Sequence, residues 1–333
     1  MVTAPLPADS RPILTYSPAY TIVPTYSCFN RCSYCNFRQD PGKSPLLPLE
    51  TAAQILRSLQ DTPITEILIL SGEVHPQSPD RSAWFQHLYD LATLALDLGF
   101  LPHTNAGPLS FGEMAQLKQV NVSLGLMLEQ LTPQLQVTVH RHAPSKDPAL
   151  RLAQLHQAGE LRIPFTTGLL LGLGESWADR RASLAAIAEV QNRWGHLQEV
   201  ILQPYVPGSQ ENWRQTPFTG ADLVRTVAIA RKLLPESIQI QVPPNLMSLA
   251  DLKACLEAGA RDLGGIGPKD EVNPDYPHDR VQELQTWLMA EGYRLQPRLP
   301  VYPAYNSWLP QPLQTQLHSS SRNTSGTVSG CTR

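Results

Sequence analysis

Residues 165–195 read FTTGLLLGLGESWADRRASLAAIAEVQNRWG and contain the unit from which the whole fold is built. The first seven residues form a β-rich apolar run, and residues 177–194 follow a helical pattern that stops before Gly195. A strand followed by a helix that ends at glycine is typical of the βα units of a parallel sheet. The stretch therefore predicts one βα unit with a short loop between strand and helix.

The same alternation continues in both directions along the chain. Strands are predicted at residues 20–24, 66–70, 101–105, 122–127, 165–171, 199–203, 238–242 and 262–266. Helices are predicted at residues 49–59, 84–98, 111–118, 148–158, 177–194, 223–233, 249–258 and 280–291. Eight βα units favour an α/β fold of the closed (β/α)8 TIM-barrel type, and an open partial barrel of six βα units is the alternative. In either barrel, functional side chains are expected just after the strand ends.

Length and composition suit one barrel domain with tails, because 42% of the 333 residues are hydrophobic. We expect a flexible N-terminus at 1–13, the barrel at 14–310 and a disordered tail at 311–333, where Ser, Thr and Gln dominate. The net charge of -3 and the absence of a basic run argue against a nucleic-acid partner. No apolar stretch approaches membrane-span length and no secretory signal is recognisable, so a cytoplasmic protein without membrane contact is expected.

Three of the five cysteines, Cys28, Cys32 and Cys35, lie within eight residues directly after the first predicted strand. Such clustering favours metal binding over a disulfide framework. A cubane iron-sulfur cluster is usually held by four cysteines, so three would leave one iron open for another ligand. The alternatives are a structural zinc site, with His103, His140 or His142 as fourth ligand, and incidental buried cysteines. Cys255 lies in an apolar helical pattern and is expected to be a buried free thiol.

The pattern Cys-x3-Cys-x-aromatic-Cys at residues 28–35 resembles the signature of the radical S-adenosylmethionine (SAM) superfamily. The resemblance implies one [4Fe-4S] cluster held by Cys28, Cys32 and Cys35, with the methionine part of SAM on the open iron. It also implies that Tyr34 lies near the adenine of SAM.

Two further elements resemble SAM-binding motifs of the same superfamily. Ser71, Gly72 and Glu73 follow the second strand and resemble its Gly-Gly-Glu element, with serine at the first position; this implies that Glu73 binds the SAM amino group. Residues 168–175 resemble its Gly-x-Ile-x-Gly-x-x-Glu element at the fifth strand. The adenine would then lie against Gly168, Leu170 and Gly172.

Longer strings narrow the resemblance to the deazaflavin-forming branch of the superfamily, over residues 16–303; they include 103–107, 125–129, 163–168, 195–200, 243–246, 262–266 and 272–274. The resemblance implies a lyase of coenzyme F420 biosynthesis that closes a ring on 5-amino-5-(4-hydroxybenzyl)-6-(D-ribitylimino)-5,6-dihydrouracil. It also implies a companion subunit that makes this substrate, and a low-potential electron donor of flavodoxin or ferredoxin type. The alternative is another radical SAM enzyme, such as the companion subunit, which joins a tyrosine-derived group to an aminouracil.

Polar residues at strand ends are candidates for binding such a substrate. His103 is the first choice for moving protons, because the ordinary pKa of histidine lies near neutrality. The candidates for binding the uracil and ribityl parts are Asn105, Glu129, Thr166, Thr167, Gln203 and Asn245, and Arg141 is a candidate for holding an anionic group. The loops at 204–208 and 264–268 are expected to cover the site.

Overall fold

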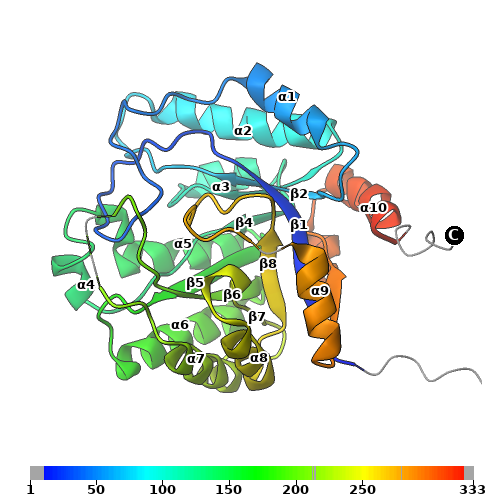
Figure 1. The fold of residues 1–333 in the computed structure, drawn as a ribbon. Helices are drawn as coiled ribbons and strands as arrows, with labels where there is room; N and C mark the ends of the chain where they lie inside the picture. The colour runs from blue at the N-terminus through cyan, green and yellow to red at the C-terminus, as the bar shows by residue number, and fades with distance from the viewer. Residues whose placement is uncertain (1–10, 212, 214, 279, 326–333) are drawn as a thin grey trace, which may run out of the picture.

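The computed structural model describes residues 11–211, 213, 215–278 and 280–325. Its centre is a parallel barrel (Figure 1) of β1 (Ile13–Ile22), β2 (Glu66–Leu70), β3 (Leu101–Asn105), β4 (Ser123–Gly125), β5 (Phe165–Leu171), β6 (Leu197–Pro204), β7 (Gln239–Gln241) and β8 (Asp262–Ile266). Each strand pairs with the next, and β1 closes the barrel by pairing with both β2 and β8. The predicted closed eight-unit barrel is confirmed, and the open six-unit alternative is wrong.

Helices cover the outside of the barrel (Figure 1): α1 (Leu49–Ser58), α2 (Arg81–Asp97), α3 (Phe111–Leu117), α4 (Gln134–Val137), α5 (Pro148–Glu160), α6 (Trp177–Trp194), α7 (Gly220–Leu233), α8 (Leu249–Ala258) and α9 (Val281–Ala290). The Thr219 hydroxyl accepts the Asp222 amide at 3.1 Å and caps α7. Ser176 and Asp179 form a reciprocal capping box at α6. Among the described residues, no helix is long and apolar enough to cross a membrane.

Two elements after α9 were absent from the sequence prediction. β9 (Arg294–Pro297) adds to the first half of β1, and the chain then crosses the N-terminal end of the barrel. There the Pro300 carbonyl accepts hydrogen bonds from Ser123 and Gln198, at 2.7 and 3.0 Å. This crossing segment closes the barrel floor.

The second element, α10 (Gln311–Ser325), shows that the disordered tail predicted at 311–333 was wrong over 311–325. Leu313 and Leu317 stand four residues apart in α10, so they share one side of the helix, and they pack with Leu309, Leu101 and Val122. The polar composition of the segment concealed this single apolar stripe. Residues 326–333 and the predicted flexible residues 1–10 lie outside the described residues.

The buried His196, between α6 and β6, makes the stability of the barrel depend on pH. Burial lowers the pKa of His196 to about 3, so the folded protein holds it neutral. In the unfolded chain its pKa is near 6.5, so unfolding takes up a proton between about pH 6.5 and pH 3, and stability falls as the pH drops through that window. We expect His196→Phe to reduce the slope of unfolding free energy against pH by about one proton, whereas His318→Phe, at an exposed position, leaves it unchanged. Denaturant unfolding from pH 7 to pH 4 measures both slopes, and equal slopes in wild type and His196→Phe would contradict the assignment.

Candidate functional site

The three clustered cysteines lie on the loop that leaves β1 at the carboxyl end of the barrel. The amide of Cys28 donates to the Gln39 carbonyl at 3.0 Å, and the amide of Cys35 donates to the Cys32 carbonyl at 3.2 Å. All three thiols are free, with Cys28 buried and Cys32 and Cys35 partly exposed. The loop therefore folds back on itself and carries three unoxidised thiols.

The chemistry of these thiols fits a metal centre that takes up thiolates. Burial raises the pKa of Cys28, and it raises the pKa of Cys32 to about 12 against the opposing charge of Lys146. Without a metal the buried thiols therefore hold their protons, and iron binding would displace them.

A zinc site is poorly supported by the positions of the three candidate histidines. His103 is bonded to Ser123 inside the barrel, the His140 ring bonds the Tyr34 hydroxyl at 3.0 Å, and His142 is exposed. Within the described part of the chain, no three Cys, His, Asp or Glu side chains are arranged to hold a single metal ion. A cubane cluster, whose ligands bind different iron atoms, fits the loop better.

Glu73 lies at the centre of a polar network beside the cysteine loop. Its carboxylate accepts hydrogen bonds from Asn30 at 2.8 Å, from Ser145 and from Arg151 at 3.2 Å. Arg151 is almost fully buried and also donates to the Met127 carbonyl. The sequence analysis missed Arg151, because a basic residue in a helix is ordinarily solvent-exposed. The network fixes the Glu73 carboxylate at the side of the loop.

Gly72 makes a different contact from the one expected from its motif. Its amide donates to the Thr25 carbonyl at 2.8 Å, and a Cβ at this position would lie 2.2 Å from the Ser27 carbonyl oxygen. The neighbouring Ser71 is buried, and its hydroxyl accepts from the Trp84 indole at 3.0 Å. Gly72 thus allows the backbone of the cysteine loop to lie close to the end of β2, and Ser71 holds α2 against β2 through Trp84.

Gly72→Ala is therefore expected to displace the cysteine loop. Overpacking of this kind costs about 1–3 kcal/mol of unfolding free energy. The matched control is Gly112→Ala in α3, where a Cβ meets nothing within 4 Å and should stabilise by about 0.5–1 kcal/mol. Denaturant unfolding of both variants measures the difference, and equal effects would show that the loop contact is unimportant.

The other residues of the SAM-binding prediction gather around Tyr34 and the end of β5. Tyr34 and Leu170 both pack on the apolar cluster that contains Leu173 and Tyr205. A Cβ at Gly168 would lie 2.4 Å from the Ile201 carbonyl oxygen, and Gly172 has a φ of +95° in the turn after the strand. The Glu175 carboxylate, at the last position of the motif, accepts the amides of Gly172 and Leu173, each at 2.8 Å, and so shapes this turn.

The barrel lumen contains a cavity of about 180 Å³. Five of the predicted substrate-binding residues line it: His103, Asn105, Thr166, Gln203 and Asn245. They come from β3, β5, β6 and the turn after β7, so the fold brings together side chains that are far apart in the sequence.

Three other candidates lie elsewhere. Glu129 has a φ of +66° and pairs with Lys146 on the side of the cysteine loop. Arg141 is exposed in the loop after α4. Thr167 is fully buried and its hydroxyl accepts the Leu128 amide at 3.2 Å, because alternate residues of a strand face opposite sides. The structure therefore does not place these three in the lumen.

A second cavity of about 450 Å³ lies beside Glu73, between the loops that follow β2 and β3. Its walls are mostly apolar and include Phe29, Val74 and Leu109, together with the ion pair of Arg81 and Glu113. The predicted substrate-binding residues do not line it. We therefore take the lumen as the substrate site.

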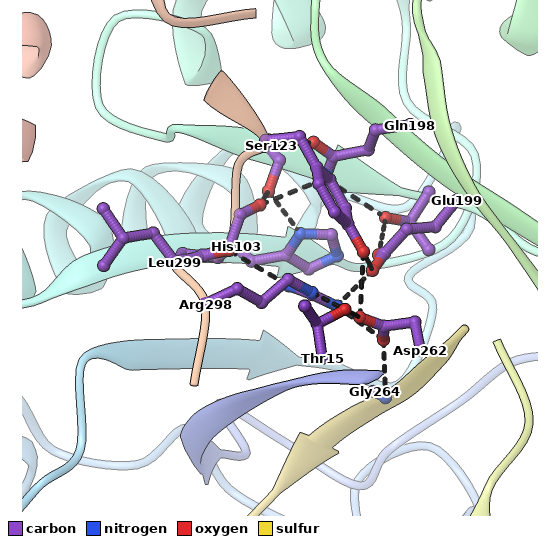
Figure 2. A network of polar contacts seen from close by, with 12 residues as sticks. Thr15, His103, Ser123, Gln198, Glu199, Asp262, Gly264, Arg298 and Leu299 are labelled. Carbon is purple, nitrogen blue, oxygen red and sulfur yellow. Dashed lines mark hydrogen bonds and ion pairs between the residues drawn. The ribbon is translucent and has the colours of Figure 1, made fainter. Parts of the chain in front are cut away.

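The floor of the lumen is an ionic network that the sequence analysis missed (Figure 2). Arg298, after β9, donates two hydrogen bonds to Asp262, at 2.7 and 2.9 Å, and one to Glu199. The Tyr302 hydroxyl donates to Asp262 at 2.8 Å and Thr15 also contacts that carboxylate. Burial raises the pKa of Glu199 in spite of the Arg298 charge, whereas for Asp262 the charge and hydrogen bonds of Arg298 outweigh burial and lower the pKa.

His103 is also part of this floor, and its surroundings remove the reason for assigning it a proton-moving role. Burial and, to a smaller extent, the nearby Arg298 charge lower the pKa of His103 to about 3. The His103 ring is therefore neutral at physiological pH, and its pKa does not lie near neutrality as the assignment required.

Loops that follow β6 and β8 meet the cysteine loop over the carboxyl end of the barrel. The Asn36 amide donates to Asp275 at 3.0 Å and its oxygen accepts the Gln210 amide at 2.8 Å. The Tyr26 hydroxyl donates to Glu271 at 2.8 Å. These contacts hold the two loops against the cysteine loop above the lumen.

Comparison with known proteins identifies the family. Residues 22–187 match the Radical SAM superfamily. The 7,8-didemethyl-8-hydroxy-5-deazariboflavin synthase of Synechococcus elongatus is 64% identical over 306 residues, which cover 92% of this chain and 91% of that protein. The synthase of the same name from Thermosynechococcus vestitus is 62% identical over 305 residues, which cover 91% of this chain and 97% of that protein.

Solved structures of lower identity share the fold. The FeFe-hydrogenase maturase HydG from Carboxydothermus hydrogenoformans superposes with a TM-score of 0.69 at 16% identity, over 94% of this chain and 77% of that one. Methylornithine synthase gives a TM-score of 0.66 at 14% identity, over 93% of this chain and 86% of that one. The fold, the matched superfamily and the identity along nearly the whole chain agree, and this protein belongs to the 7,8-didemethyl-8-hydroxy-5-deazariboflavin synthase family of radical SAM enzymes.

Proposed function

We propose that this enzyme converts 5-amino-5-(4-hydroxybenzyl)-6-(D-ribitylimino)-5,6-dihydrouracil, called the adduct below, to 7,8-didemethyl-8-hydroxy-5-deazariboflavin. Ammonia, methionine and 5′-deoxyadenosine are the other products, and the reaction belongs to coenzyme F420 biosynthesis. The observation that carries the proposal is the 64% identity to a synthase of this name along 92% of the chain. The polar lumen beneath the three-cysteine loop supports it, because the adduct needs both polar and apolar contacts.

The family implies a [4Fe-4S] cluster and SAM, and we infer that Cys28, Cys32 and Cys35 hold the cluster. When bound, the cluster would supply the electron for reductive cleavage of SAM, and SAM would supply the radical chemistry that removes hydrogen from the substrate. Glu73, fixed by Asn30 and Arg151, keeps carboxylate lone pairs for the SAM amino group. This assignment leaves the methionine part of SAM beside the cysteine loop.

On the adenine side, we infer contacts from the Tyr34 ring and from the end of β5. Gly168 and Gly172 carry no side chains there, and Leu170 adds an apolar surface beside Tyr34. On the methionine side, beside Glu73, Ser71 and Gly72 would contribute through their backbone carbonyls, since their amides donate to Asn105 and Thr25 and the Ser71 hydroxyl is bonded to Trp84.

The chain's own residues then bind the substrate and exclude water. Asn105, Gln203 and Asn245 offer amide donors and acceptors to the uracil and ribityl groups, and Thr166 lies deeper in the lumen. The loops joined by Asn36 cover the carboxyl end of the barrel and keep solvent from a reactive carbon radical.

We further propose that the companion subunit supplies the adduct and that a flavodoxin or ferredoxin supplies the electron. Both proteins, and the cytoplasm as the place of the reaction, follow from the proposed chemistry.

Two substrate sets separate this proposal from the companion-subunit alternative. The reconstituted enzyme is incubated anaerobically with SAM and reductant, either with the adduct or with tyrosine plus the ribityl aminouracil. We expect deazaflavin from the adduct and no adduct from the second set. Adduct formation from tyrosine would assign the companion reaction instead.

A further inference from the structure

The inward side chains of the lumen change in character from the floor to the mouth. Along β6 they run from Glu199 through Ile201 to Gln203, and along β3 from His103 to Asn105. The middle of the lumen is mostly apolar, with walls that include Leu68, Ile201 and Leu263, although the Gln241 amide lies level with Ile201. The mouth carries the amides of Asn105, Gln203 and Asn245. The lumen is thus polar, then apolar, then polar along its axis.

The carboxylates of the floor are already engaged by donors of the protein. One oxygen of Glu199 accepts from Thr166 at 2.9 Å, and the other accepts from Arg298. Both oxygens of Asp262 accept from Arg298, and one of them also accepts the Gly264 amide at 2.7 Å. A ligand that reaches the floor therefore meets carboxylates that have donors in place.

His103 offers an uncharged acceptor to such a ligand, near Glu66, whose carboxyl group also lines the lumen and whose pKa is raised by burial. Its Nδ1 lies 2.6 Å from the Ser123 hydroxyl, which donates its one hydrogen to the Pro300 carbonyl at 2.7 Å (Figure 2). Ser123 must then accept from His103, so Nδ1 carries the proton and Nε2 has a free lone pair. Because burial keeps the ring neutral, Nε2 is an acceptor and not a donor.

We propose that the floor of the lumen binds the hydroxyl of the substrate's 4-hydroxyphenyl group, which donates to Nε2 of His103. This inference rests on the proposed function. The aromatic ring then lies in the apolar middle, against Leu68, Ile201 and Leu263. The hydroxyl of the substrate supplies the donor that Nε2 of His103 needs, and the aromatic ring of the substrate suits the apolar middle of the lumen.

The dihydrouracil and ribityl groups fit the other end of the lumen. Their alternating donors and acceptors need partners of both kinds, which amide side chains offer. At the mouth, Asn245 donates to Asp270 at 2.9 Å, and its buried Oδ1 has no partner within the described residues. Binding in this direction holds the uracil carbon that carries the amino group near the cysteine loop.

Gly125, at the end of β4, allows a test that keeps the His103 side chain. A Cβ at this position would lie 2.8 Å from Nε2 of His103, so Gly125→Ala displaces the ring or covers the acceptor with a methyl group. The direct variants are His103→Leu, which removes the acceptor, and His103→Gln, whose amide oxygen can replace it.

The test compares the affinities of the holoenzyme, with SAM and without reductant, for the adduct and for its analogue with a benzyl in place of the 4-hydroxybenzyl group. We expect wild type to prefer the hydroxylated adduct by about 10-fold or more, because the analogue leaves a buried acceptor unpaired. His103→Leu and Gly125→Ala should lose this preference, and His103→Gln should keep part of it. If His103 had only a structural role, its replacement would reduce the affinities for the adduct and for the analogue by the same factor.

Equal affinities in wild type, or an unchanged preference in both His103→Leu and Gly125→Ala, would overturn the inference. Deazaflavin production by wild type is measured separately. If deazaflavin forms and the hydroxyl preference is absent, only the subsite is wrong. If the preference is present and no deazaflavin forms, the hydroxyphenyl subsite stands and the proposed reaction fails.

Discussion

Cys32→Ala is expected to abolish SAM cleavage while leaving the barrel folded. The loop then offers two thiols in place of three, and a cubane with two protein ligands does not stay bound. Cys32 contributes no more than partly buried packing, so the fold itself should persist. Iron and sulfide content, the spectrum of the reduced cluster and 5′-deoxyadenosine formation measure the loss, and circular dichroism measures the fold.

Cys255→Ala is the matched control, since Cys255 is a fully buried thiol on α8, away from the cysteine loop. It loses a small apolar group from the core and should retain iron, sulfide and SAM cleavage. If Cys32→Ala kept a full cluster and wild-type cleavage, or if Cys255→Ala lost them, the assignment of the cluster to the loop would be wrong.

Arg298→Met is expected to lower the unfolding free energy by about 3–5 kcal/mol, the effect of removing one partner from a buried ionic network. Asp262 and Glu199 would keep their burial without the opposite charge that now bonds both of them. The apolar replacement fills part of the space and cannot donate a hydrogen bond. Denaturant unfolding of the cluster-free protein measures the effect without a contribution from iron.

Arg280→Met provides the comparison at the surface. The Arg280 side chain is 83% exposed and lies 4.0 Å from Glu283, so its replacement should change stability by no more than about 0.5 kcal/mol. Equal losses in Arg280→Met and Arg298→Met would contradict the role assigned to the floor network.

The alternation of strands and helices was predictable because it depends on local periodicity. β2, β3, β5 and β8 begin and end where the sequence pattern predicts them. β1 begins earlier than predicted, at Ile13, because its first half pairs with β8 and β9, and such pairing is not visible in the local pattern. The same limitation explains the absence of β9 and α10 from the prediction.

The positions of site residues were predictable where a sequence motif or a strand end fixes them. Their protonation and partners were less predictable, because these depend on burial. The cysteine loop and the lumen residues followed from strand ends. The low pKa of His103 depends on its burial and on the charge of Arg298, and Glu199 depends on the same Arg298, which lies about a hundred residues after Glu199 and further still from His103. The sequence did contain a signal for this floor, because three predicted strands begin with an acidic residue: Glu66, Glu199 and Asp262.

The most direct test of the proposed reaction is a single incubation of the anaerobically reconstituted enzyme with dithionite, SAM and the adduct. We expect 5′-deoxyadenosine together with fluorescent 7,8-didemethyl-8-hydroxy-5-deazariboflavin, with both products absent from Cys32→Ala. Deoxyadenosine without deazaflavin, from enzyme with a full iron load, would contradict the proposed substrate and product.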